Sequence, residues 1–157
     1  MEKNKRVAIA SLVFSAGAFV TLAMNEGYSP VAYIPVKGDV PTIGFGNTHD
    51  VYLGERTTPI QAMQTTLKDV GDVEKEVKQC VTVPLTQGEY DAYIDFTYNV
   101  GGYAFCHSTL VQLLNQKNYD GACRQLLRWD MFHGKVLPGL AARRWQEYRR
   151  CIGDNNV

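Results

Sequence analysis

The sequence predicts an α+β protein that is mainly α, with a small β-hairpin lobe and a larger helical lobe. Two β-prone segments flank a Gly-Asp turn between residues 31 and 46, which indicates the hairpin. From residue 58 onward, apolar residues recur at helical spacing between helix caps. An uncharged N-terminal run adds one more helix before the hairpin. The chain has 157 residues, which suffices for one domain with its own core.

The N-terminal run from Val7 to Met24 contains 18 uncharged residues. A helix rises about 1.5 Å per residue, so this run reaches roughly 27 Å, slightly less than the roughly 30 Å apolar core of a bilayer. Three basic residues precede it (Lys3, Lys5 and Arg6), and positive flanks of this kind stay cytoplasmic. The sequence therefore predicts a weakly hydrophobic anchor over residues 1–24 and an exported domain over residues 25–157.

Two other interpretations of this run stay open. One is a cleaved signal peptide, which also has a basic start and an apolar centre. Its cleavage site is poor, because the nearest small-residue pattern is Thr21-Leu22-Ala23, and cutting there leaves Glu26 close to a new terminus. The other is a helix buried in the core of the protein.

The β-prone segments cover residues 31–36 and 40–46, on either side of a turn at Lys37-Gly38-Asp39. Pro35 and Pro41 have no backbone N–H, so these strands are expected at an edge. The glycines of Gly44-Phe45-Gly46 resemble a phosphate-binding loop only superficially. No third glycine, no Lys-Ser or Lys-Thr and no following helix accompany them, which argues against a nucleotide site.

Five helices are predicted after the hairpin, each from a start signal and an apolar pattern. Thr58-Pro59 begins the first, Thr86 to Glu89 forms a capping box for the second, Ser108 caps the third, Asp120 caps the fourth, and Pro138 begins the fifth. The second helix is expected to end at Gly101-Gly102, and the fourth to continue to Trp129.

The formal net charge is zero, which argues against a general nucleic-acid binder. Four cysteines occur without CxxC spacing (Cys80, Cys106, Cys123 and Cys151), so neither a zinc site nor a redox motif is indicated. Disulfides are the natural interpretation in an exported chain, and the sequence does not choose among three connectivities. We favour Cys123–Cys151, on successive helical segments, which leaves Cys80 with Cys106; buried free thiols are the alternative.

Several short motifs occur in an order typical of one family. They are Glu26-Gly27 with Tyr33 seven residues after the glutamate, Pro41-Thr42-Ile43-Gly44-Phe45-Gly46, Phe96-Thr97-Tyr98-Asn99-Val100-Gly101, Ser108-Thr109-Leu110, Gly121-Ala122-Cys123 with Arg128-Trp129, and Gly139-Leu140 followed by Arg143-Arg144 and Glu147. In these motifs the chain resembles phage-type lysozymes of the T4 lysozyme kind, glycoside hydrolase family 24. It is more closely similar to the signal-anchor-release endolysins of phages that infect Gram-negative bacteria, whose releasable anchor the weakly hydrophobic N-terminus matches.

The resemblance implies a lysozyme-like two-lobe fold. It also implies hydrolysis, with inversion, of the β-1,4 bond between N-acetylmuramic acid and N-acetylglucosamine in peptidoglycan. A glycosidic oxygen is a poor leaving group, so a carboxylic acid must protonate it while a second group activates or positions water. The resemblance gives the first role to Glu26, which directly follows the uncharged run and Asn25.

The second half of the site departs from the family pattern. Counting from Glu26 places Pro35 where the family has Asp or Cys, and proline has no side-chain group for that work. Thr42 matches the family threonine that holds the attacking water. Asp39 is the only acid within the hairpin and becomes the candidate second carboxylate, with an ordinary turn residue as the alternative. Asp50 is an outside candidate.

Strict strand alternation would place Asp39 and Thr42 on opposite faces, so they converge only if the turn breaks that alternation. By the same resemblance, Tyr33 and Asn99 match positions that line or support the family's cleft. Arg144 could bind peptidoglycan carboxylates, with packing between the lobes as the alternative. Asn47 stands where many relatives have His.

The expected partners are peptidoglycan and, before release, the inner membrane through residues 7–24, with a holin or pinholin acting alongside. We expect a monomer exported to the host periplasm, with no nucleic acid, cofactor or metal. After release, the former anchor is expected to supply the helix that positions Glu26. Two other functions stay open: a lytic transglycosylase, which forms 1,6-anhydromuramic ends, and a non-catalytic wall-binding protein that assists lysis.

Overall fold

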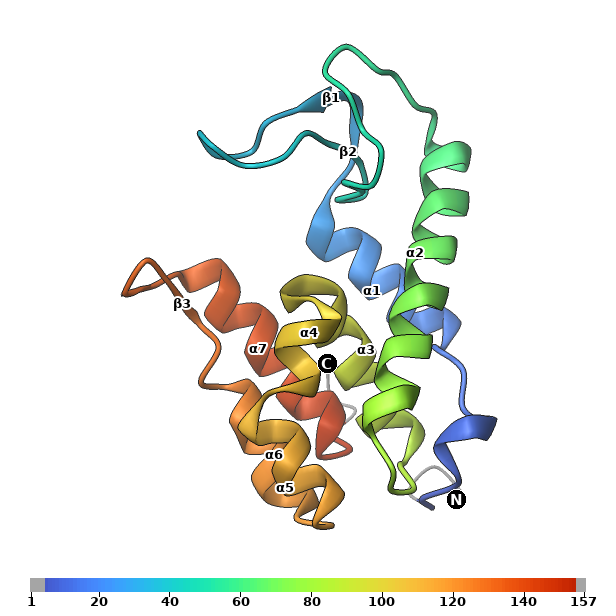
Figure 1. Ribbon diagram of the computed structural model, residues 1–157, viewed down its shortest axis with the longest axis vertical. Helices are drawn as coiled ribbons and strands as arrows, with labels where there is room; N and C mark the ends of the chain where they lie inside the picture. Colours follow the sequence, from blue (N-terminus) through green and yellow to red (C-terminus); the bar gives the residue numbers. More distant parts are fainter. Residues whose placement is uncertain (1–4, 155–157) are drawn as a thin grey trace. The chain divides into compact units, whose positions relative to one another are not determined.

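The computed structural model describes residues 5–154 and divides the chain into two compact units. The hairpin unit comprises Phe19–Asp72, and the helical unit comprises Met1–Ala18 together with Val73–Val157. The chain passes from one unit to the other within two helices, α1 (Ala16–Glu26) and α2 (Pro59–Cys80), both labelled in Figure 1. The predicted class, α+β and mainly α with a small β-hairpin, is confirmed.

The hairpin unit contains strands β1 (Ser29–Tyr33) and β2 (Thr42–Gly44), which pair antiparallel. Both are shorter than predicted, because neither proline at 35 or 41 can donate to a strand ladder. Ser29 pairs with Gly44 and Tyr33 with Thr42, so β1 bulges between its ends. The bulged part bonds instead to residues 55–57, where Val31 bridges Arg56.

The helical unit continues from the end of α2 through α3 (Gln87–Val100), α4 (Gly102–Cys106), α5 (Thr109–Asn115), α6 (Tyr119–Leu126) and α7 (Pro138–Cys151). A short hairpin of β3 (Met131–Phe132) and β4 (Lys135–Val136) lies between α6 and α7. Helix α3 packs against α7. The fully buried apolar core includes Leu85, Tyr90, Tyr93, Ile94, Phe96, Phe105, Leu110, Leu114 and Leu126.

Most predicted helix starts are confirmed at the level of individual bonds. Thr86 accepts from Glu89 N and the Glu89 carboxylate accepts from Thr86 N, which is a complete capping box. Ser108 caps α5. The predicted cap at Asp120 was wrong: the cap is Asn118, two residues earlier, whose Oδ1 accepts from Gly121 N, and α6 ends at Leu126. Helix α4 and the β3–β4 hairpin were not predicted.

Residues 7–15 do not continue α1 toward the N-terminus. They form a bridge between Val7 and Leu85 and a single 3-10 turn, η1 (Ile9–Ser11), before α1 starts at Ala16. Ser15 Oγ accepts from Ala18 N and thereby caps α1. Within residues 5–154, every helix is too short or too polar to cross a lipid bilayer.

The helical unit holds this N-terminal segment, residues 6–15, with polar side chains. Arg6 pairs with Glu89 at 2.8 Å, and Ser15 donates to Asp91 through both its N–H, at 3.0 Å, and its hydroxyl, at 2.6 Å. Three further bonds reach its backbone: Lys78 Nζ to Leu12 O at 2.6 Å, Gln87 Nε2 to Val13 O at 2.8 Å, and Phe14 N to Glu74 Oε2 at 3.2 Å.

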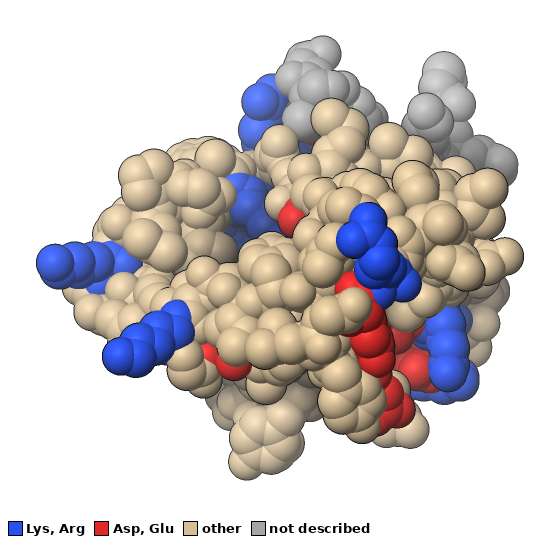
Figure 2. Space-filling view, turned by 90° about the horizontal axis from the view of Figure 1, so that it is seen from above, with Lys and Arg blue, Asp and Glu red and all other residues tan. Residues whose placement is uncertain are grey.

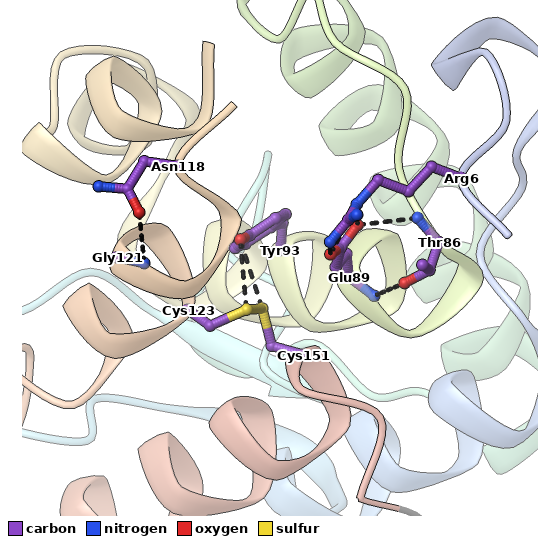
Figure 3. The surroundings of a disulfide bond; sticks show 8 residues. All are labelled: Arg6, Thr86, Glu89, Tyr93, Asn118, Gly121, Cys123 and Cys151. Atoms are coloured by element: carbon purple, nitrogen blue, oxygen red, sulfur yellow. Dashed lines mark hydrogen bonds and ion pairs between the residues drawn. A yellow bond between two sulfur atoms is a disulfide. The ribbon is translucent and has the colours of Figure 1, made fainter. Parts of the chain in front are cut away.

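Two disulfides are present, Cys80–Cys106 and Cys123–Cys151, as favoured from the sequence. Figure 3 shows the Tyr93 hydroxyl beside both sulfur atoms of the second, at 3.8 Å from Cys123 Sγ and 3.3 Å from Cys151 Sγ. The disulfide thus joins α6 and α7 next to α3. On the face seen in Figure 2, acidic and basic side chains are both present and neither sign covers it, in keeping with a formal net charge of zero.

Candidate active site

Glu26 is the last residue of α1 and is half-buried within the hairpin unit. Its carboxyl group lies directly against Gly46: a Cβ added to that glycine would be 2.8 Å from Glu26 Oε2 and 3.3 Å from Cδ. Only a residue without a side chain leaves room for the carboxyl group in this position. The structure therefore brings together Glu26 and the Gly44-Phe45-Gly46 motif, which are separated by the whole hairpin.

A tight turn, residues 43–47, presents Gly46 to Glu26. Ile43 and Asn47 close it with two reciprocal backbone hydrogen bonds of 2.9 Å each. Gly44 has φ +63° and Gly46 has φ +79°, a backbone conformation that L side chains rarely adopt. The strand predicted as far as residue 46 ends at Gly44 for this reason.

Thr42 and Tyr33 are direct partners across β1 and β2, so their side chains share one face of the hairpin. Thr42 is buried and donates to Val40 O at 3.3 Å, whereas Tyr33 is exposed. Asp39 lies in the turn between the strands, is exposed, and accepts from Val40 N at 2.9 Å. Because β2 begins only at Thr42, strand alternation does not relate these two residues.

Asn99 and Arg144 are brought together in the helical unit, where Arg144 donates to Asn99 Oδ1. Arg144 is 1% exposed, and it also donates to Glu147 at 2.6 Å and to Trp129 O at 2.9 Å. Asn99 itself is exposed at the end of α3. The contacts of Arg144 are those of a packed side chain that fixes its exposed neighbour.

A buried charge cluster surrounds this pair. Arg143 bonds Asp95 at 2.8 Å and lies 3.3 Å from Glu147, which also contacts Arg144. Burial raises the pKa of Glu147 to about 7, although Arg144 acts in the opposite direction.

Comparison with known proteins shows the family. Residues 23–147 match the family model described as Phage lysozyme. The chain is 33% identical to the SAR-endolysin of Enterobacteria phage PA-2 over 93% of its length and 87% of that protein. It is 35% identical to the SAR-endolysin of Pseudomonas phage phiKMV over 95% of its length and 92% of that protein. The chain belongs to the phage lysozyme family.

A solved endolysin from Escherichia coli O157:H7 phage FAHEc1 supports the same assignment for the fold. It is 30% identical to this phage lysozyme, with a TM-score of 0.81, and the match covers 94% of this chain and 96% of that one. This phage lysozyme is therefore a glycoside hydrolase, an endolysin that degrades peptidoglycan for host lysis.

The residues predicted for the site of this lysozyme fall into two groups. Glu26, Tyr33, Asp39 and Thr42 belong to the hairpin unit, and Asn99 and Arg144 belong to the helical unit. Among residues 5–154, no cluster of three or more His, Cys, Asp or Glu side chains could hold a metal ion. No role for Gly46 was predicted from the sequence. Two glycines flanking a single residue were the available signal for its tight turn.

Proposed function

We propose that this endolysin hydrolyses the β-1,4 bond between N-acetylmuramic acid and N-acetylglucosamine, with Glu26 as the general acid. The packing of the Glu26 carboxyl group against Gly46 supports this role most directly, because it fixes one carboxyl group beside the family's glycine motif. Thr42 and Asp39 are proposed to hold the attacking water, which makes the reaction inverting. In the helical unit, Asn99 is proposed to bind the glycan, with Arg144 acting through it.

Replacing Glu26 with Gln tests the acid directly. The amide keeps the size of the side chain but cannot protonate the leaving oxygen, so release of reducing ends from purified peptidoglycan should fall by about 10²- to 10⁴-fold. Glu55→Gln removes the same charge from an exposed position of the hairpin unit and should leave the rate unchanged. Full lytic activity of Glu26→Gln would instead support a non-catalytic role in lysis.

A lytic transglycosylase remains the second candidate, because it needs one acid and no partner carboxylate. Asp39 is exposed in a turn and accepts from Val40 N, and this position supports the transglycosylase as the second candidate. Mass spectrometry of the digested wall separates the two reactions: reducing muramic ends are expected from hydrolysis, and 1,6-anhydromuramic ends from the alternative.

We further propose that residues 1–24 first act as a releasable anchor in the inner membrane, which the SAR-endolysin relatives support over most of the chain. Residues 25–157 then form the periplasmic domain, and a holin or pinholin would trigger release. The contacts of residues 6–15 support the released state, because Asp91 and Glu89 are buried carboxylates whose partners include Ser15 and Arg6. A carboxylate left buried without a partner is costly, so docking of the freed segment is favoured.

A further inference from the structure

Asn47 is a buried polar residue, 3% exposed, that closes the turn on which the Glu26 carboxyl group rests. We propose that Asn47 is a positioning residue for catalysis: its side-chain amide fastens the 43–47 turn to α2 and so fixes where Gly46 holds the Glu26 carboxyl group. The inference rests on the proposed role of Glu26 as the general acid.

The amide of Asn47 uses both of its ends. Its Oδ1 accepts from Phe45 N, inside the turn, at 3.3 Å. Its Nδ2 donates to Asp69 Oδ2 at 2.8 Å and to Thr66 Oγ1 at 3.2 Å, both on α2. A carboxylate at position 47 could still accept from Phe45 N but would have no N–H for Asp69. Thr66 Oγ1 also lies 3.4 Å from Asn47 Oδ1 and could donate to a carboxylate, so it is the bond to Asp69 that needs a donor at position 47.

Close packing transmits this link to the acid. A Cβ on Gly44 would be 2.8 Å from Asn47 Oδ1 and 2.9 Å from the Cβ of Ala62, so one side of the turn lies tightly against α2. On the other side of the turn, a Cβ on Gly46 would be 2.8 Å from Glu26 Oε2. The Phe45 ring also packs on Tyr28, two residues after the acid, with ring centroids 5.3 Å apart. A shift of the turn must therefore move the surface against which the carboxyl group rests.

Exchanging the donor and the acceptor tests the link. Asn47→Asp sets two carboxylates against each other and should lower kcat on purified peptidoglycan by about tenfold or more, since misplacement by about 1 Å can cost about 10²-fold. Asp69→Asn alone should cost little, because the new amide can turn its oxygen toward Asn47. The double variant Asn47→Asp with Asp69→Asn restores one donor and one acceptor, and should recover most of the lost kcat.

Two readouts distinguish positioning from general stabilisation. The KM should stay within about twofold, because glycan binding is unchanged. The alkaline limb of the kcat/KM profile reports the loss of a proton donor. This limb should shift in Asn47→Asp and return to its wild-type position in the double variant. Asn115→Asp is the matched control: Asn115 accepts from Thr82 N and donates to Cys80 O in the helical unit. It should lower the Tm without moving the pH profile.

The outcomes separate this inference from the proposed function. If Glu26→Gln is inactive and Asn47→Asp keeps its kcat and pH profile, Asn47 has no positioning role. The same conclusion follows if the double variant regains Tm but not kcat. If Glu26→Gln stays active, the proposed acid itself is wrong. If Asn47→Asp fails to fold, Asp69→Ala is used in its place, because it removes the acceptor of the Asn47 Nδ2 bond at a half-buried position. This variant must show the same loss of kcat.

Discussion

Asp39 and Thr42 differ in how firmly their surroundings hold them. Thr42 is 8% exposed and fixed by strand pairing with Tyr33, whereas Asp39 is exposed in a turn and oriented by its bond to Val40 N. A water held by both would depend on Thr42 for its position and on Asp39 for its activation as a nucleophile. Loss of Asp39 should therefore be less severe than loss of the proton donor.

We accordingly expect Asp39→Asn to lower kcat by about tenfold, a smaller loss than general acid catalysis supplies. Initial rates of reducing-end release from peptidoglycan measure the effect. Lys37→Gln changes a charge in the same turn and should have no effect on these rates. A wild-type rate for Asp39→Asn would show that water is positioned without this carboxylate, which would leave Thr42 as the residue that holds the water.

Glu147 makes stability depend on pH. Burial raises its pKa from 4.5 to about 7, so the native state binds more protons than the unfolded state between these values. The free energy of unfolding should therefore fall as the pH rises through this window, by on the order of 1–3 kcal/mol. Below pH 4.5 both states are protonated and the contribution of Glu147 is complete.

Glu147→Gln should remove this dependence, because Gln does not titrate. Urea unfolding at several pH values from 4 to 8 measures it: the wild type should lose stability toward neutral pH, and the variant should lose less over the same window. Equal slopes for both proteins would contradict the assignment.

Among the elements, the capping box of α3 offers the clearest local stability test. Thr86→Ala removes the hydroxyl that accepts from Glu89 N, and should cost about 1 kcal/mol of unfolding free energy. Thr86→Ser keeps the hydroxyl and should cost much less. Chemical denaturation at a pH well away from the Glu147 window measures both. Equal stabilities of the Ala and Ser variants would mean that the bond contributes nothing.

The same element shows what a sequence can predict. Capping boxes and Pro at the first helical position depend on residues within one turn, so the starts of α2, α3, α5 and α7 were predictable. The 43–47 turn depends on Asn47 meeting Thr66 and Asp69 about twenty residues later, and no local pattern reports that contact. The first predicted strand ran past Tyr33, and the second began before Thr42, because β-prone residues continue into the loop between them.

For the candidate site, motif spacing assigned roles to Glu26 and Thr42, and these roles stay predictions. The disulfide partners, predicted from the order of the helices, are confirmed. The bulge in β1 was not predictable, because it arises where residues 55–57 pair with the other edge of that strand. The packed role of Arg144 was also open, since its burial depends on Asn99 and Trp129 in other parts of the helical unit.

At the scale of the whole molecule, stability has to survive export. The disulfides join residues 26 and 28 positions apart, and cross-links over loops of this length stabilise by about 3 kcal/mol each in the chain-entropy model. They form in oxidising compartments, which agrees with the proposed periplasmic location. In the proposed release mechanism, the N-terminal segment adds its own bonds to the helical unit only once it has left the membrane.

Three positions within the proposed anchor are exposed in the structure, and they allow the proposed anchor to be strengthened without disturbing the enzyme. Ser11, Ala16 and Gly17 are exposed, and a Cβ on Gly17 would meet no atom within 4 Å. Replacing all three with Leu should favour the bilayer by about 1–2 kcal/mol, which lowers the released fraction by roughly tenfold. Lysis should be delayed, while the purified soluble variant digests peptidoglycan at the wild-type rate.

Fractionation of membranes and periplasm, together with lysis timing, measures the effect of the Leu variant. As a control, the same three positions changed to Gln should show no delay. If the Leu variant is released and lyses cells as early as the wild type, residues 1–24 do not control activity by residing in the membrane.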